Sequence, residues 1–269
     1  MKITTVLAAA AALLTMGAAQ PGTAPPTSEP MASVARASGY LGAGLPDTYA
    51  ILPPAPAPGD PRDVADREVF RATRTLQGTA RWTQAQNDAD QAGIVKDLAC
   101  AVGVELTPQN APRTFALLRK LAPDVGRATN LPKDIYKRPR PYLRDEGPIC
   151  VGRTAALAAS PDYPSGHNTW AWTVGLIMAE LVPDRATPIL VRARAFGENR
   201  LVCGVHSLSA VEMGQLNGSI VVAALHGNPQ FRSDLDAARA ELAAVRRTGP
   251  RPDPAVCARE AALDAHSPF

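Results

Sequence analysis

The stretch PSGHNTWAWTVGLIMAELVPD, residues 164–184, contains the start, the body and the end of one strongly apolar helix. Ser165 belongs to the residue types preferred at an N-cap, and Gly166 follows it where the helix begins. Pro183 then starts a further helix that ends near Arg200. Because alanine is abundant and strand patterns are nearly absent elsewhere, the sequence predicts an all-α fold, a single-domain helical bundle.

Helical spacing recurs on both sides of this stretch. Helices are predicted over residues 110–127, 165–181 and 207–225, with a proline in the first turn of the earliest one. Residues 130–147 read as a loop because they contain several prolines and no apolar period. From residue 63 onward, the apolar residues expected to be buried are Val64, Phe70, Leu76, Trp82, Ile94, Val95 and Leu98.

Four parts follow one another along the chain. Residues 1–19 have the order of a secretory signal peptide, for which an N-terminal membrane anchor is the alternative interpretation. Residues 20–62 are rich in Pro and Ala and predict an N-terminal arm, followed by a helical domain over 63–249 and a tail over 250–269. No later stretch offers about 18 uninterrupted apolar residues, so we expect no integral membrane span.

Charge and cysteine content further limit the possible functions and locations of the protein. The formal net charge is +3 and the basic residues are scattered, which argues against nucleic-acid binding. Four cysteines in an exported chain favour two disulfides and a periplasmic or secreted location. Of the three possible pairings we prefer Cys150 with Cys203 and Cys100 with Cys257. No Cys-x-x-Cys pair occurs, so a zinc site is not expected.

Three polar segments interrupt the apolar pattern: KDIYKRPRP at 133–141, PSGH at 164–167 and NRLVCGVH at 199–206. Each alone has an ordinary structural interpretation. The first could be a solvated loop, the second a helix N-cap and the third a hydrogen-bonded buried histidine. Their joint order and spacing favour a functional site.

The segments resemble the signature of the phosphatidic acid phosphatase type 2 superfamily, written Lys-x6-Arg-Pro, Pro-Ser-Gly-His and Ser-Arg-x5-His-x3-Asp. Lys133 and Arg140 match the first part, residues 164–167 match the second, and Arg200 and His206 match the third. The flanking sequence also resembles the bacterial class A non-specific acid phosphatases. The predicted signal peptide points to that secreted branch, because the lipid phosphatases of the superfamily span the membrane several times.

The resemblance implies a hydrolase that cleaves phosphate monoesters to inorganic phosphate through a phosphohistidine, with no metal or other cofactor and an acidic pH optimum. His206 is expected to attack phosphorus, and His167 to protonate the leaving group and then activate water. Cationic side chains and donors at a helix start would bind the phosphate. These groups are Lys133, Arg140, Ser165, Gly166 and Arg200.

Two positions depart from the signature, with Asn199 for the leading Ser and Ala210 for the final Asp. In the family that Asp lies about one helical turn beyond the nucleophilic histidine and orients its ring, which alanine cannot do. We therefore expect a slowed phosphatase in which Ser207, Ser209, Glu198 or a backbone carbonyl holds the ring.

Two other functions fit the same segments. A degenerate periplasmic phosphate-binding protein would keep the cationic residues without turnover. A vanadate-dependent haloperoxidase would bind vanadate at the same place, although such enzymes are usually much longer. The alanine-rich helices suit a homo-oligomer as well as a monomer.

Overall fold

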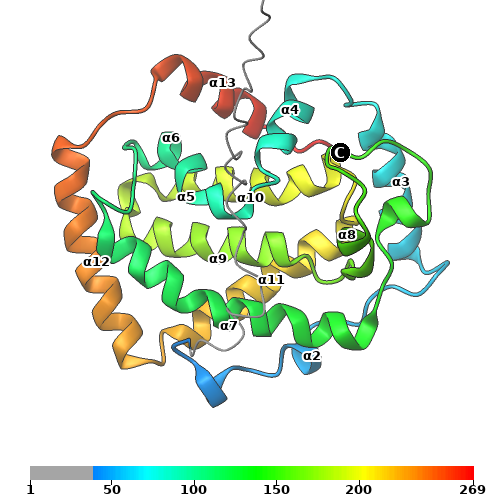
Figure 1. Cartoon of the computed structure of the whole chain (residues 1–269), viewed down its shortest axis with the longest axis horizontal. Coiled ribbons are helices and arrows are strands. Elements are labelled where there is room, and N and C mark those ends of the chain that lie inside the picture. The colour runs from blue at the N-terminus through cyan, green and yellow to red at the C-terminus, as the bar shows by residue number, and fades with distance from the viewer. Residues whose placement is uncertain (1–38) are drawn as a thin grey trace, which may run out of the picture.

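The computed structural model describes residues 39–269, and within that part of the chain every regular element is a helix. Helix α9 (Gly166–Leu181) runs through the middle. It packs between α10 (Ala186–Val202) on one side and α7 (Pro112–Tyr136) and α11 (Leu208–Leu225) on the other (Figure 1). The predicted all-α, single-domain bundle is confirmed.

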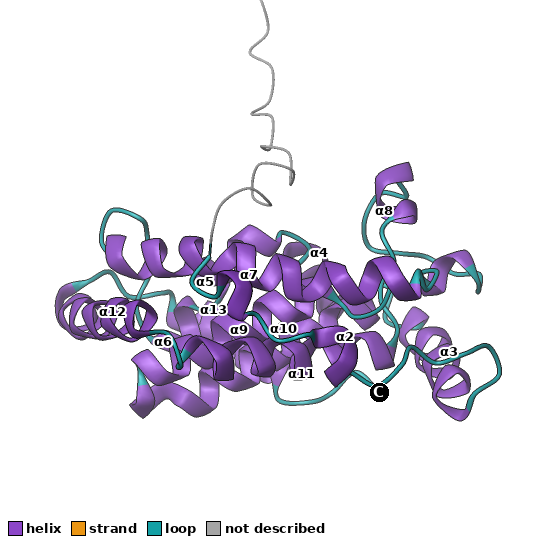
Figure 2. Ribbon diagram, turned by 90° about the horizontal axis from the view of Figure 1, so that it is seen from below, coloured by secondary structure: helices purple, strands orange, loops and turns teal. Residues whose placement is uncertain are grey.

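Shorter or peripheral helices surround these four. In the perpendicular view α8 (Ala155–Ala159) stands off the main layer of helices (Figure 2). The others, in chain order, are η1 (Gly42–Gly44), α2 (Thr48–Ile51), α3 (Pro61–Arg74), α4 (Ala80–Asn87), η2 (Gln91–Gly93), α5 (Ile94–Asp97), α6 (Ala99–Val102), η3 (Pro141–Leu143), η4 (Pro183–Arg185), α12 (Pro229–Thr248) and α13 (Pro254–Asp264).

Glycines let α11 approach α9 closely. A Cβ at Gly214 would lie 2.8 Å from the carbonyl oxygen of Ser165, and one at Gly218 would lie 2.9 Å from that of Thr169. Both distances are shorter than van der Waals contact, so a larger residue would push α11 away. The close approach also lets the Ser165 N–H donate to the Ala210 carbonyl at 2.9 Å, which joins the start of α9 to α11.

Helix α7 continues to Tyr136, so its last turns occupy a stretch that the sequence predicts as loop. The prediction is wrong because it treats Pro132 as a helix breaker. A proline inside a helix leaves the carbonyl four residues earlier, here that of Ala128, without its usual partner. That carbonyl accepts hydrogen bonds from Thr48 Oγ1 at 2.7 Å and Asn217 Nδ2 at 3.1 Å, so two distant segments replace the missing bond.

Helix α3 turns a charged face toward the bundle. Asp63 and Asp66 are buried on it beside Phe70, whereas Val64 is 46% exposed. The predicted burial of Val64 is wrong because the inward face of α3 contacts a buried arginine, Arg138, and not an apolar surface. The other residues predicted as buried lie as expected, fully so for Phe70, Trp82, Ile94, Val95 and Leu98 and partly for Leu76.

Two disulfides connect distant parts of the bundle, and both are the preferred pairs. Cys100–Cys257 joins α6 to α13, and Cys150–Cys203 joins the loop after η3 to the end of α10. Residues 250–269, predicted as a tail, thus contain a helix that packs on α6 and α10.

The N-terminal part of the chain lies on the bundle where it is described. In the predicted arm, Tyr40, Thr48 and Leu52 are buried. The predicted signal peptide, residues 1–19, lies outside the described residues.

Among the described helices, α11 has the length and apolar composition that a membrane span would need. A helix in the centre of a bundle has the same composition. Since α11 packs against α9, α7, α3 and α10, its place in the fold accounts for its apolar sequence.

Two glycine-to-alanine substitutions should have opposite effects on stability. Gly218→Ala places a Cβ 2.9 Å from a carbonyl oxygen and should lower the free energy of unfolding by about 1–3 kcal/mol. Gly126→Ala in α7 meets no atom within 4 Å and should raise it by about 0.5–1 kcal/mol. Urea denaturation of both variants checks this, and equal effects would contradict the close packing of α11 on α9.

Candidate active site

The residues singled out from the sequence come from helix ends and the turns beside them. Lys133 lies in the last turn of α7, Arg200 lies in the last turn of α10, and Ser165 is the N-cap of α9. Arg140 lies in the loop after α7, and His206 lies in the turn before α11. The structure brings these positions together, although they are distant along the chain.

Short distances and electrostatic coupling connect the group. Arg140 Nη1 lies 3.1 Å from His206 Nε2. A Cβ on Gly166 would lie 3.9 Å from Lys133 Cε, so the start of α9 borders the end of α7. Burial lowers the pKa of Arg200, and the charge of the nearby Arg140 lowers it further.

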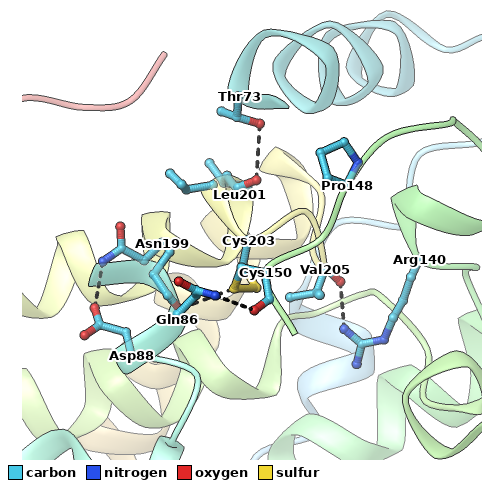
Figure 3. The surroundings of a disulfide bond; sticks show 12 residues. Thr73, Gln86, Asp88, Arg140, Pro148, Cys150, Asn199, Leu201, Cys203 and Val205 are labelled. Atoms are coloured by element: carbon cyan, nitrogen blue, oxygen red, sulfur yellow. Dashed lines mark hydrogen bonds between the residues drawn. A yellow bond between two sulfur atoms is a disulfide. The ribbon is translucent and has the colours of Figure 1, made fainter. Parts of the chain in front are cut away.

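The turn from α10 to α11 is held from several sides (Figure 3). The Cys150–Cys203 disulfide joins it to the loop after η3, and the Cys150 N–H donates to the Cys203 carbonyl at 3.0 Å. Arg140 Nη1 donates to the Val205 carbonyl at 2.7 Å. Gly204 has a φ of 77°, a left-handed conformation that favours glycine. The turn therefore has little freedom to move.

The contacts of His206 define its tautomer. A guanidinium can only donate, so the contact with Arg140 makes Nε2 an acceptor and places the proton on Nδ1. Nδ1 lies 2.9 Å from Asp162 Oδ1, which accepts. Burial, followed by the charges of Arg140, Lys133 and Arg200, lowers the pKa of His206 well below its ordinary value. The ring is thus neutral, with the lone pair of Nε2 among the cations.

Asp162 is a site residue that the sequence analysis missed. It is fully buried, and its Oδ1 accepts from His206 and from the Ser207 N–H at 3.1 Å. Its Oδ2 accepts from Ser207 Oγ at 2.5 Å and Arg138 Nη1 at 3.3 Å. The available signal was an acidic residue just before the segment 164–167, in a loop otherwise poor in acidic residues.

Ala210 is buried in the first turn of α11 and offers the site only its backbone. The substitutes expected to hold the His206 ring lie elsewhere or act indirectly. Glu198 forms ion pairs with arginines, and Ser209 Oγ donates to a carboxylate of α3, so the expectation is wrong for both. Ser207 reaches the ring only through its hydrogen bonds to the carboxylate of the preceding loop.

His167, in the first turn of α9, has a fixed ring. It stacks on Phe196 with ring centroids 4.9 Å apart and an interplanar angle of 10°. Burial, then the charge of Arg200, lowers the pKa of His167 well below its ordinary value. Its Nε2 is buried and makes no hydrogen bond to any described residue, which leaves this nitrogen free to bond a ligand.

The cations of the site are buried without enough acceptors. Arg200 Nε and Nη1 have no hydrogen-bond partner within residues 39–269, and burial with the nearby Arg140 lowers the pKa of Arg200 to about 10. Burial and Arg140 likewise lower the pKa of Lys133 to about 7. Buried donors and like charges are costly. A bound anion would satisfy the donors and offset the repulsion, as a phosphate site requires.

The loop before α9 touches the site cations. The Pro161 carbonyl accepts from Lys133 Nζ, and the Ser160 carbonyl accepts from Arg140 Nε at 2.8 Å. Ser160 Oγ accepts from Arg140 Nη2 at 3.2 Å. These neutral acceptors partly satisfy the cations but leave their charge uncompensated.

Asn199, which stands where the signature has Ser, faces away from this cluster. Its Nδ2 donates to Asp88 Oδ2 at 2.7 Å (Figure 3). Its Oδ1 accepts from Arg81 Nε at 2.6 Å. Arg192 binds both oxygens of Asp88 at 2.8 and 2.7 Å. Asn199 therefore ties α10 to α4, which makes it a structural residue.

Comparisons with known proteins show the family of the chain. The profile of the PAP2 superfamily matches residues 116–233. An acid phosphatase of Zymomonas mobilis is 39% identical over 218 residues, which cover 78% of this chain and 81% of that protein. Non-specific acid phosphatases of Providencia stuartii and Salmonella typhimurium are 33% and 32% identical. These two alignments cover 75% and 71% of this chain, and 83% and 78% of those proteins.

The pKa of Lys133 predicts how anion binding depends on pH. A lysine is charged below its pKa, so Lys133 loses its charge as the pH rises through about 7. Sulfate stays a dianion across this range, and its affinity should fall about tenfold between pH 6 and 8.5, as expected for losing one charge-assisted hydrogen bond. Calorimetric titration at each pH measures the affinity.

Lys133→Arg should flatten this profile, because a guanidinium keeps its charge. Lys137→Arg, at an exposed position just beyond α7, is the matched control and should keep the wild-type profile. A wild-type affinity that stays constant to pH 8.5 would contradict the lowered pKa of Lys133.

Proposed function

The chain belongs to the PAP2 superfamily and, within it, to the acid phosphatases, and we propose that it hydrolyses phosphate monoesters through a phosphohistidine on His206 without a metal ion. One observation carries the proposal. The Nε2 lone pair of a neutral His206 lies 3.1 Å from the Arg140 guanidinium, inside a cluster of buried cations. A phosphoryl group bound by those cations would meet this lone pair.

The cations and the start of α9 would hold the phosphate. Arg200 has two unsatisfied nitrogens that can donate to the phosphate oxygens, and Arg140 and Lys133 add positive charge. At the start of α9, the Ser165 hydroxyl and the Gly166 N–H add donors where the helix dipole favours an anion. Together they offset the negative charge that grows on the phosphoryl oxygens, which is the role a metal ion has in other phosphatases.

The first chemical step forms a bond from His206 Nε2 to phosphorus and breaks the ester P–O bond. His167 gives its proton to the departing oxygen. In the second step His167 takes a proton from water, the hydroxide bonds to phosphorus, and the P–N bond breaks to release inorganic phosphate. Each histidine returns to its starting state.

The charge of the substrate prepares His167 for the first step. Burial and Arg200 lower the pKa of His167 in the free protein, whereas a bound phosphate dianion raises it. The protonated form is favoured further at acidic pH. We therefore expect turnover to be fastest in acid.

We also propose that the chain is exported to the periplasm or beyond. Support comes from the sequence order of residues 1–19 and from the two disulfides, which persist in oxidising compartments. N-terminal sequencing of periplasmic material tests this, with a mature chain expected to begin near Gln20.

Hydrolysis of p-nitrophenyl phosphate, followed across acid to neutral pH with a chelator present, tests the mechanism. Wild type should turn over and form an acid-labile phosphoenzyme, and His206→Ala should do neither. Folded wild type that binds phosphate without turnover would instead indicate a degenerate phosphate-binding protein. Turnover lost on chelation would contradict the metal-independent mechanism.

The leaving group should reveal the role of His167. p-Nitrophenolate departs without needing a proton, so His167→Ala should still form phosphoenzyme from this substrate. With an alkyl phosphate the same variant should form it about 10²–10⁴-fold more slowly, the usual range for lost general acid catalysis. Rapid-quench measurement of both rates checks this, and equal losses on both substrates would remove His167 from the acid role.

A further inference from the structure

We propose that Asp162 is the positioning carboxylate of His206, supplied by the loop before α9 in place of the α11 carboxylate that Ala210 lacks. The inference rests on the proposed phosphohistidine mechanism, in which His206 must present its Nε2 lone pair to phosphorus. It changes one expectation drawn from the sequence, because a protein with this carboxylate need not be slowed by alanine at position 210.

The contact has the geometry that the role requires. Asp162 Oδ1 accepts from His206 Nδ1 at 2.9 Å and so keeps the proton on the nitrogen that does not react. When Nε2 bonds to phosphorus the imidazole ring becomes positively charged, while Nδ1 keeps its proton. The carboxylate opposite Nδ1 then stabilises that charge, as the acid does in a Ser-His-Asp triad.

Asp162 is itself held in place by a buried guanidinium. Arg138 Nη1 lies 3.3 Å from Asp162 Oδ2 and donates to Ser207 Oγ at 2.7 Å. Its Nη2 donates to Asp63 at 2.9 Å and to Asp66 at 2.7 Å, so α3 fixes the position of Arg138. The carboxylate therefore cannot turn away from His206 without breaking a connected set of buried bonds.

The hydrogen bonds of Asp162 also indicate its charge state. Each oxygen receives two donors, and a proton on either oxygen would displace one of them. Burial raises the pKa of Asp162, while Arg138, the Ser207 donors and Lys133 act against that rise. The donor geometry favours the ionised form, which is the form that accepts from His206.

Two isosteric variants separate positioning from structural support. Asp162→Asn should lower the rate of phosphoenzyme formation by about 10²–10⁴-fold with KM changed less than about threefold, by analogy with triads that lose their acid. Asp124→Asn is the matched control, since Asp124 of α7 is also a buried carboxylate, but its hydrogen bonds go to the Tyr40 and Leu41 N–H groups and to Arg127. It should lower stability while keeping that rate within about threefold of wild type.

The tautomer of His206 is a second measurement, and a change in the stability of the protein alone would not alter it. Ring ¹⁵N shifts of labelled protein are assignable because the chain has four histidines and His206→Ala identifies the signal. Near neutral pH, wild type and Asp124→Asn should show the proton on Nδ1, and Asp162→Asn should lose this preference. The double variant with both Asp162→Asn and Ala210→Asp should form phosphoenzyme at least tenfold faster than Asp162→Asn alone.

Two results would overturn the proposal: a wild-type His206 with its proton on Nε2, or a rate for Asp162→Asn no lower than that for Asp124→Asn. If Asp162→Asn does not fold, the wild-type tautomer still decides. A wild type without phosphatase activity would overturn the proposed function alone, because the tautomer is measured without substrate.

Discussion

Lys133, Arg140 and Arg200 lie close together and almost out of contact with solvent. Burial lowers the pKa of all three, and the charge of Arg140 lowers those of Lys133 and Arg200 further. Such a cluster is stable only where the surrounding fold holds each side chain in place. The end of α7 is held through the Ala128 carbonyl, and the turn after α10 through a disulfide. A doubly charged phosphoryl group removes the repulsion, so the strain of the free site favours binding.

Around this cluster the sign of the charge alternates outward. Asp162 lies next to the cations and accepts from His206, and Arg138 in turn pairs with Asp162. Asp63 and Asp66 of α3 come next, and Asp63 in turn accepts from Arg144 at 2.6 and 3.0 Å. Each layer lowers the cost of burying the one inside it, because a paired charge is far less costly to bury than a lone one.

The sequence was most informative about site residues that lie at or next to the ends of helices. The spacing of Lys133, Arg140, Arg200 and His206 relative to apolar helices was enough to predict a site, and the apolar pattern was enough to predict the bundle. Position 162 was missed because its contact with the histidine ring spans 44 residues and depends on how a loop folds.

Two errors in the fold have the same origin. The extension of α7 past Pro132 depends on donors from Thr48 and Asn217, which no local pattern reveals. Val64 was misplaced because periodicity assumes that the inward face of a helix is apolar, whereas α3 faces a buried arginine. Long-range polar partners were the missing information in both cases.

Because Asp162 contacts His206 Nδ1 from the loop before α9, the missing Asp at position 210 has to be interpreted differently. A sequence search that requires an acidic residue at position 210 would reject this chain, although the ring of His206 has a carboxylate partner. A lineage that acquired Asp162 before losing the older acid would have passed through an ancestor with both and never lacked one. In such a lineage a motif position can drift while the chemistry around the histidine is conserved.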